Sequence, residues 1–372
     1  MMMKTTSAAA ALVFAATAAL AALTLFWTWW HHRRGASESF FGFHGGGDDS
    51  TTKTIFVSVA SFRDVECSNT VRDLFAKAVH PERVFVGTCE QNELQGEEAD
   101  GESCVGSNFK WAKNVRRILV PYTEAGGPTV ARYFCSLLFR DEDYFLQIDS
   151  HSEFVRGWDD LLVKQQSGLP DPSKGVLTGY PRSLDDSRSH PGIAVICKSK
   201  FDRNGVPTFE SVILDVKNHH FPVSFLAGGF IFAPGSFLRD VPFDNGLEGL
   251  FAGEEILLSA RAWTAGYDFY APTHNAIYHH YVRKGSPKFW DLPNKGRLRA
   301  KQAKAVDKVK LLMSGKTPSP GYAFGMGKAR SVHEYNAFAT LDWDARTSSS
   351  FDKFCSAGLA SATASATAST AA

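Results

Sequence analysis

The alternation of short β-branched segments with amphipathic helical segments is the feature that most limits the fold of this chain. The pattern predicts strands over 54–60, 83–87 and 143–148, and helices over 70–79 and 128–138. Strands that alternate with helices form a largely parallel sheet that is covered on both faces. We therefore expect an α/β domain that binds its ligand beyond the carboxyl ends of the strands.

The composition is that of a folded chain with balanced charge. The 372 residues include 40 Lys and Arg against 39 Asp and Glu, and 44% of the residues are hydrophobic. This apolar content is enough for a core and excludes a disordered or fibrous chain. A nucleic-acid partner is not expected, because such proteins carry a basic excess. The six cysteines lack the spacing of a zinc module, and their even number leaves disulfides open.

The two ends of the chain differ in composition from the part between them. An uncharged apolar run over 7–30 is long enough to span a bilayer, so 1–34 is interpreted as an N-terminal signal anchor, that is, a transmembrane helix. A cleaved signal peptide or another targeting peptide is the alternative. A flexible stem is expected over 35–52, the folded body over 53–355, and a low-complexity tail over 356–372.

A carboxylate and an imidazole directly follow one of the predicted strands. Asp149 and His151 lie two residues apart in the string LQIDSHSEF, where both side chains can reach one cleft at the strand end. Together they can bind a divalent cation that bridges the oxygens of a diphosphate. For an isolated Asp-x-His the simpler alternative is that Asp149 caps a turn and that His151 is a surface residue.

Three sequence blocks, in order along the chain, resemble GT-A-type polypeptide glycosyltransferases, which use a nucleotide-sugar donor. They are LQIDSHSEFVRGWDDLL, the segment 226–270 with its Gly-Gly and Gly-Glu pairs, and IYHHYVRK. The strings IFVSVASFRD and GPTVARYF are most similar to the family that adds α-linked N-acetylglucosamine (GlcNAc) to polypeptide hydroxyls. The mucin-type polypeptide N-acetylgalactosamine (GalNAc) transferases are more distant. The resemblance covers 54–283.

The resemblance implies both a fold and an activity. The fold is α/β of GT-A type, a Rossmann-like nucleotide-sugar-binding domain behind the N-terminal transmembrane helix. The activity is a metal-dependent, retaining transfer of GlcNAc from UDP-GlcNAc to Ser, Thr or hydroxyproline of a polypeptide acceptor. Mn²⁺ or Mg²⁺ is the expected cofactor, with Mn²⁺ preferred where an imidazole binds the metal. Two alternatives stay open: a transferase that uses UDP-GalNAc, and an inactive UDP-sugar-binding membrane protein.

The same resemblance assigns the metal ligands and one diphosphate contact. It implies that Asp149 and His151 bind the metal and that His279 or His280 completes the set. In the mucin-type pattern the last ligand lies three residues before an arginine, which points to His280, but the adjacent His279 leaves the choice open. Arg283 is implied as the group that stabilises the leaving diphosphate, because a guanidinium is always protonated.

Further contacts to the donor nucleotide are implied at two places. Arg132 resembles the diphosphate-contacting arginine of the family, and a solvated helix face is the alternative. Three residues lie where GT-A enzymes contact the nucleoside, although a simple β-turn fits them equally well: Ser61, Arg63 and Asp64.

Contacts to the donor sugar are implied in the second block. Gly228 and Gly229 lack a Cβ and allow close approach of the sugar, while a bulge in a buried strand is the alternative. Glu254 is implied as a hydrogen-bond acceptor for sugar hydroxyls. Its alternative is a carboxylate at a helix start, where the dipole favours negative charge.

The location of the body follows from the order of its segments. An anchor, a glycine-rich stem and a transferase are the usual layout of a single-pass type II Golgi membrane protein with its catalytic domain in the lumen. Arg33 and Arg34 directly after the apolar run favour the alternative, a membrane-anchored protein with a cytoplasmic catalytic domain.

Overall fold

The computed structural model describes residues 53–94, 103–106, 108–183, 192–216, 220–283, 285–292 and 295–356. These described residues belong to one compact unit. The anchor expected over 1–34, the stem over 35–52 and the tail beyond Ser356 lie outside the described residues. Within these described ranges, no helix is long and apolar enough to cross a bilayer.

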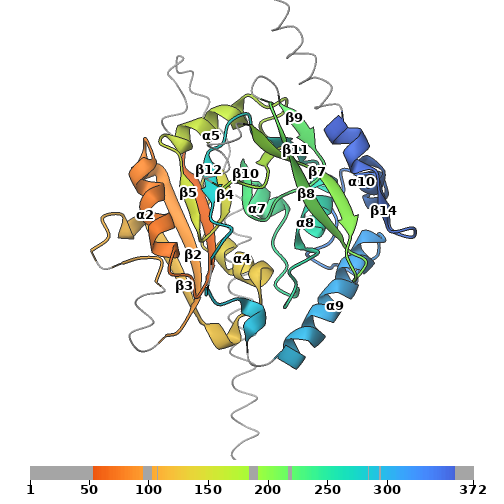
Figure 1. Cartoon of the computed structure of the whole chain (residues 1–372), viewed down its shortest axis with the longest axis horizontal. Helices are drawn as coiled ribbons and strands as arrows, with labels where there is room; N and C mark the ends of the chain where they lie inside the picture. Colours follow the sequence, from red (N-terminus) through yellow and green to blue (C-terminus); the bar gives the residue numbers. More distant parts are fainter. Residues whose placement is uncertain are drawn as a thin grey trace, which may run out of the picture. The chain divides into compact units, whose positions relative to one another are not determined.

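An eight-stranded mixed sheet organises this unit (Figure 1). The order is β3-β2-β1-β4-β10-β6-β11-β9, and only β10 and β9 run antiparallel to their neighbours. The largely parallel sheet that the sequence predicted is therefore confirmed. The strands are β1 (Ile55–Phe62), β2 (Val84–Asn92), β3 (Val115–Pro121), β4 (Tyr144–Asp149), β6 (Gly175–Thr178), β9 (Phe221–Val223), β10 (Phe230–Pro234) and β11 (Asp268–Ala271).

The predicted elements of the first half are present with shifted bounds. The three predicted strands are β1, β2 and β4, and the two predicted helices are α2 (Cys67–Lys77) and α4 (Pro128–Ser136). Helix α2 begins three residues earlier than expected, because Asp64 turns the chain into it. The Asp64 carbonyl accepts the backbone N–H of Cys67, and its carboxylate accepts that of Glu66.

Helices cover both faces of the sheet. In β1, Val57 and Val59 belong to a core that includes α2 and α5 (Trp158–Ser167). Phe56 points to the opposite face and belongs to the core that includes α8 (Glu254–Thr264). Successive residues of a strand alternate between its two faces, so one strand contributes to both cores.

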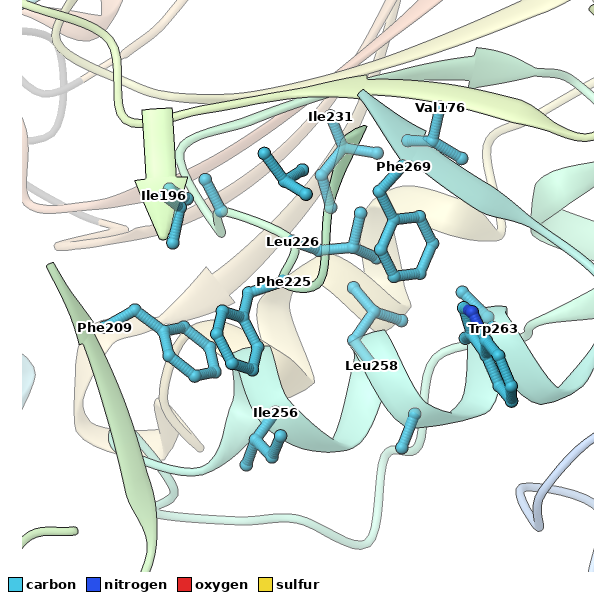
Figure 2. Packing of buried hydrophobic residues seen from close by; sticks show 14 of the residues in the cluster. Val176, Ile196, Phe209, Phe225, Leu226, Ile231, Ile256, Leu258, Trp263 and Phe269 are labelled. Atoms are coloured by element: carbon cyan, nitrogen blue, oxygen red, sulfur yellow. The ribbon is translucent and has the colours of Figure 1, made fainter. Parts of the chain in front are cut away.

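The core around α8 is built from aromatic and aliphatic side chains (Figure 2). The rings of Phe209 and Phe225 stack at 4.0 Å, and Trp263 of α8 stacks on Phe338 at 5.3 Å. Phe209 comes from a hairpin whose turn over 202–205 is closed by a hydrogen bond from the Gly205 backbone N–H to the Asp202 carbonyl at 2.9 Å. The surrounding elements are β7 (Ile193–Phe201), β8 (Pro207–Leu214), α7 (Phe237–Asp240), α9 (Lys295–Met313) and α10 (Val332–Phe338).

A separate two-stranded ribbon places a distant segment beside the end of β4. Strand β5 (Ser152–Phe154) pairs antiparallel with β12 (Ile277–His279), so that His279 lies opposite Ser152. The other short elements are β13 (Leu341–Asp342), β14 (Thr347–Ser348), η3 (Pro81–Arg83), η4 (Ala112–Asn114), η5 (Tyr122–Glu124), η6 (Phe289–Asp291) and η7 (Phe351–Cys355).

Two disulfides cross-link the unit. One joins Cys67 to Cys104, and the other joins Cys197 of β7 to Cys355 at the end of η7. Cys89 and Cys135 are buried free thiols. The second disulfide fixes the end of the described chain to the β7–β8 hairpin across 158 residues of sequence.

Candidate functional site

Asp149, His151 and His279 form a cluster at the carboxyl end of β4. Each offers one possible ligand atom, and these atoms all lie within 4.8 Å of one another. Oδ2 of Asp149 is 3.1 Å from Nε2 of His279, and the two imidazole rings are 4.5 Å apart between centroids. The pairing of β12 with β5 therefore joins His279 to an Asp-x-His motif 130 residues earlier in the chain.

Of the two adjacent histidines, the structure brings His279 to this cluster. His280 is half exposed, and its Nε2 lies 3.9 Å from a carboxylate oxygen of Glu153 instead. Neighbouring residues of an extended chain point in opposite directions, so only one of the pair can face Asp149. The spacing to Arg283 that favoured His280 does not predict this orientation.

Asp64 orients one of the imidazoles. Its Oδ2 lies 2.7 Å from Nδ1 of His151, and it also accepts hydrogen bonds from Ser150 Oγ at 2.6 Å and Arg283 Nη1 at 3.0 Å. Burial alone would raise the Asp64 pKa, but the hydrogen bonds from His151 and Ser150 lower the pKa to about 2. The carboxylate is thus charged, and the Nε2 atom of His151 is left for a ligand.

Arg132 is a buried cation that contacts the carboxylate oxygen of Asp149 that His279 does not contact. Its Nη2 donates to Oδ1 of Asp149 at 3.0 Å, and its Nη1 donates to Glu254. Thr129 Oγ1 donates to the second oxygen of Glu254 at 3.0 Å. Burial opposes the charge of Arg132, but the neighbouring Glu254 and Asp149 carboxylates raise its pKa above the ordinary value.

The cluster fits a divalent cation by its chemistry. One carboxylate and two imidazoles form a donor set that suits Mn²⁺. Burial opposes the charge of Asp149, yet the hydrogen bond from His279 and the charge of Arg132 hold its pKa below the usual range. A carboxylate that fixes the second nitrogen of a histidine, as Asp64 does for His151, is the common support of a metal ligand.

The two glycines of the second sequence block make room for this arrangement. A Cβ at Gly228 would lie 2.9 Å from Nη1 of Arg132, and a Cβ at Gly229 would lie 3.1 Å from Oδ2 of Asp149. Side chains at these positions would displace both groups. The positions of Arg132 and Asp149 therefore explain why glycine is required at 228 and 229. Close approach of a sugar to these glycines stays a prediction.

Glu254 and Glu255 have different surroundings at the start of α8. Glu254 is buried, and both its oxygens are engaged by Arg132 and Thr129, so a contact to sugar hydroxyls stays a prediction. Glu255 accepts from the backbone N–H of Gly228 at 2.7 Å and from the Tyr180 hydroxyl at 2.8 Å. Burial, with the charge of Glu254, raises the Glu255 pKa to about 7.

The sequence alone does not identify Glu255 or Tyr180 as residues of the site. The signal for Glu255 is its position directly after Glu254 at a helix start, where the resemblance gives a role to only one of the two carboxylates. Tyr180 follows β6 by two residues and has no motif around it. Only the folded chain shows that its hydroxyl reaches Glu255.

The predicted nucleoside contacts lie at the end of β1, next to Asp64. Ser61 is fully buried, and its hydroxyl has no hydrogen-bond partner within the described part of the chain. Arg63 has a positive φ of 46°, and its guanidinium lies 4.6 Å over the ring of Tyr122. These residues share the sheet edge with the cluster, and their contact with a nucleoside stays a prediction.

The family comparison matches most of the described chain. A family model described as "Glycosyltransferase (GlcNAc)" matches residues 54–109 and 94–345. Among curated proteins, no sequence matches.

Solved structures show the same type of fold. GalNAc-T7, in a crystal structure with UDP, GalNAc and Mn²⁺, is similar with a TM-score of 0.50 at 13% identity, over 77% of this chain and 54% of that one. This chain thus spans about half the length of that protein. The similarity supports a mixed α/β fold of GT-A type, as the sequence predicted.

Two further structures have lower similarity. The mannosyltransferase PcManGT from Pyrobaculum calidifontis, in complex with GDP-Man and Mn²⁺, has a TM-score of 0.40 at 15% identity, over 95% of this chain and 86% of that one. TarS residues 1–349 from S. aureus, in complex with UDP-GlcNAc, has a TM-score of 0.41 at 12% identity, over 69% of this chain and 70% of that one.

Proposed function

This chain belongs to the Glycosyltransferase (GlcNAc) family, and on that premise we propose that it transfers GlcNAc from UDP-GlcNAc to a hydroxyl of a polypeptide, with Ser, Thr or hydroxyproline as the acceptor residue. The observation that carries the proposal is the cluster of Asp149, His151 and His279 beside Arg132. The donor chemistry is carried over from GalNAc-T7, whose structure holds UDP, GalNAc and Mn²⁺.

Asp149, His151 and His279 would hold the metal. A bound divalent cation neutralises the charge that develops on a departing diphosphate. The Asp64 carboxylate keeps His151 in the orientation that presents Nε2, and Arg132 and Gly229 fix the position of Asp149.

The charge balance of the site explains why a cation would be needed. Three carboxylates contact two guanidinium groups there: Asp64, Asp149 and Glu254 against Arg132 and Arg283. A diphosphate would therefore meet net negative charge. With a divalent cation held by Asp149, His151 and His279 the sign would be reversed, and Arg283 would exchange part of its contact with Asp64 for the diphosphate.

Retention of the anomeric configuration is part of the proposal, as the resemblance implies. In that mechanism the acceptor hydroxyl attacks from the face that the diphosphate leaves, and the protein supplies positioning and electrostatic stabilisation. Glu255 and Tyr180 lie beside Gly228, where we place the donor sugar, and their hydrogen-bonding groups would orient its hydroxyls.

We place the catalytic domain in the lumen of the Golgi, behind the N-terminal anchor over 1–34. The two disulfides support this location, because disulfides persist in the secretory pathway and are rare in the cytosol. Mass spectrometry of the non-reduced full chain from cells tests it. Carbamidomethylation of all six cysteines without prior reduction would contradict the luminal location and favour the cytoplasmic alternative.

A panel of UDP-sugars tests the activity. The purified chain is incubated with Mn²⁺, hydroxyl-bearing peptides and UDP-GlcNAc, UDP-GalNAc, UDP-glucose or UDP-galactose, and released UDP is measured. We expect the fastest release from UDP-GlcNAc, and loss of release with EDTA or in Asp149→Ala. If UDP-GalNAc gives the fastest release, UDP-GalNAc replaces UDP-GlcNAc as the proposed donor. Binding of UDP with Mn²⁺ but no release from any donor would favour the inactive binding protein.

A further inference from the structure

Two large aromatic rings are exposed next to each other on the described surface. Phe251 is 58% exposed and Trp290 is 47% exposed, and their rings meet edge to face at 5.3 Å between centroids. Exposed aromatic side chains that pack on each other, rather than into the core, are typical of interaction sites. The pair therefore offers an apolar contact surface of its own.

The aromatic pair lies beside the helix starts that carry the site. Phe289, the neighbour of Trp290 in η6, packs on Gly127, where a Cβ would lie 3.3 Å from its ring. Gly127 is the N-cap of α4, the helix of Arg132, and Phe251 precedes Glu254 by three residues. A ligand that covers the aromatic pair would thus run along the edge of the proposed donor site.

Helix α9 follows η6 and carries a stripe of cations on one side. The stripe consists of residues at intervals of four, three and four, which place them on one helix face: Arg297, Lys301, Lys304 and Lys308. Figure 1 shows α9 as a long helix. The first turn of α9 contains no acidic residue.

The contacts of two of these cations show which loop the stripe lies against. Lys301 pairs with Glu248, and Lys308 donates to the Gly246 carbonyl at 2.9 Å. Glu248 and Gly246 belong to the loop that ends at Phe251, so the stripe and the aromatic pair border the same loop. Gly249 of this loop confirms the contact, since a Cβ there would lie 3.0 Å from the Leu298 carbonyl of α9.

The other two cations are available for a partner. Arg297 and Lys304 are exposed, and the described part of the chain provides no carboxylate within ion-pair distance of either. Cations near a helix N-terminus oppose the helix dipole, so Arg297 is not there to stabilise α9. Two such exposed cations on one helix face, in a chain whose total charge is +1, are a local feature that attracts an anionic partner.

We propose that Phe251, Trp290, Arg297 and Lys304 bind the acceptor polypeptide, and that the preferred acceptor carries acidic side chains and an apolar side chain near the modified hydroxyl. This inference rests on the proposed transferase function and names its acceptor class. A polypeptide is favoured over a membrane surface because the aromatic pair adjoins the helix starts of Arg132 and Glu254. An acceptor bound there would lie beside the proposed donor site.

The test compares two fluorescein-labelled peptides that differ only in charge. Both contain one Thr and one Leu; Asp and Glu flank the Thr in one peptide, and Lys replaces them in the other. Binding to the whole chain with Mn²⁺ and UDP is measured by anisotropy at low and high salt. We expect the acidic peptide to bind at least about tenfold more tightly, with the preference lost at high salt.

Two double variants assign the binding to this surface. Arg297→Glu with Lys304→Glu should weaken binding of the acidic peptide about tenfold or more. Phe251→Ala with Trp290→Ala should weaken binding of both peptides. A matched control reverses two exposed cations elsewhere, Lys113→Glu with Lys164→Glu, and should leave binding within about twofold. A circular dichroism melt of each variant verifies that it is folded.

The outcomes separate this inference from the proposed function. Equal binding of both peptides to the wild-type chain, or equal weakening by the control pair, overturns the acceptor surface. A third outcome is that the wild-type chain binds phosphatidylserine vesicles, that only the Arg297→Glu, Lys304→Glu variant loses this binding, and that neither peptide is preferred. This outcome overturns the acceptor surface in favour of a membrane-binding surface. UDP release from UDP-GlcNAc in the presence of Mn²⁺ and either peptide reports the transferase. Its absence with both peptides, together with selective peptide binding, would refute the transferase and retain the surface.

Discussion

Nδ1 of His151 lies 2.7 Å from Oδ2 of Asp64, two residues that are 87 positions apart in the sequence. The contact links the end of β1 to the end of β4, adjacent parallel strands of the sheet. It fixes the imidazole so that its other nitrogen faces Asp149 and His279. A residue that the sequence suggested as a nucleoside contact is thus found supporting a candidate metal ligand.

Replacement of Asp64 by Asn should weaken metal binding while leaving the ligands in place. The amide lacks the charge that holds the His151 ring, so we expect the Mn²⁺ concentration for half-maximal UDP release to rise about 10- to 100-fold. Excess Mn²⁺ should recover much of the rate. Ser150→Ala, which removes only a neutral donor to the same carboxylate, is the control and should shift the Mn²⁺ requirement far less.

Removal of Glu254 should destabilise the fold. Glu254→Ala leaves the buried Arg132 with Asp149 as its remaining carboxylate, and an underpaired buried charge costs about 3 kcal/mol of unfolding free energy. Urea denaturation measures the loss. Glu210→Ala breaks an exposed pair with Lys200 and should cost less than about 1 kcal/mol. Equal losses in the two variants would contradict the structural role of Glu254.

Glu255 should make stability depend on pH. Its pKa is about 7 in the folded chain and near 4.5 when unfolded, so the native state binds the extra proton between these values. Its contribution is fully present below pH about 4.5 and is lost as the pH rises through 7, by at most about 3 kcal/mol. Because Gln resembles the protonated carboxyl, the unfolding free energies of wild type and Glu255→Gln should be most similar at low pH, and wild type should become the less stable of the two as the pH rises through 7. A pH-independent difference would show that the carboxyl is not protonated there.

The sequence predicted the parts of the site that local patterns encode. The strand before Asp149, the helix that carries Arg132 and the glycines at 228 and 229 were each identified from a short string. Asp149 and the glycines lie together because β10 runs antiparallel to β4 and begins at the sheet edge where β4 ends, and Arg132 reaches Asp149 from α4. The order of the motifs along the chain therefore indicated the fold type and the location of the site.

The remaining parts depend on tertiary contacts that no local pattern encodes. The choice of His279 over His280 follows from the register of β12 on β5, and a shift of one residue would exchange the two side chains. The hydrogen bond from Tyr180 to Glu255 and the pairing of Cys197 with Cys355 likewise join segments far apart in sequence. These contacts become visible only when the strands are in place.

The two adjacent histidines provide the most direct test of the metal site and hence of the proposed transferase. UDP release from UDP-GlcNAc is measured against Mn²⁺ concentration for wild type, His279→Ala and His280→Ala. We predict that His279→Ala loses Mn²⁺-dependent release, because it removes one of three ligands, and that His280→Ala retains it. Retained release in His279→Ala, with loss in His280→Ala, would contradict the site described here.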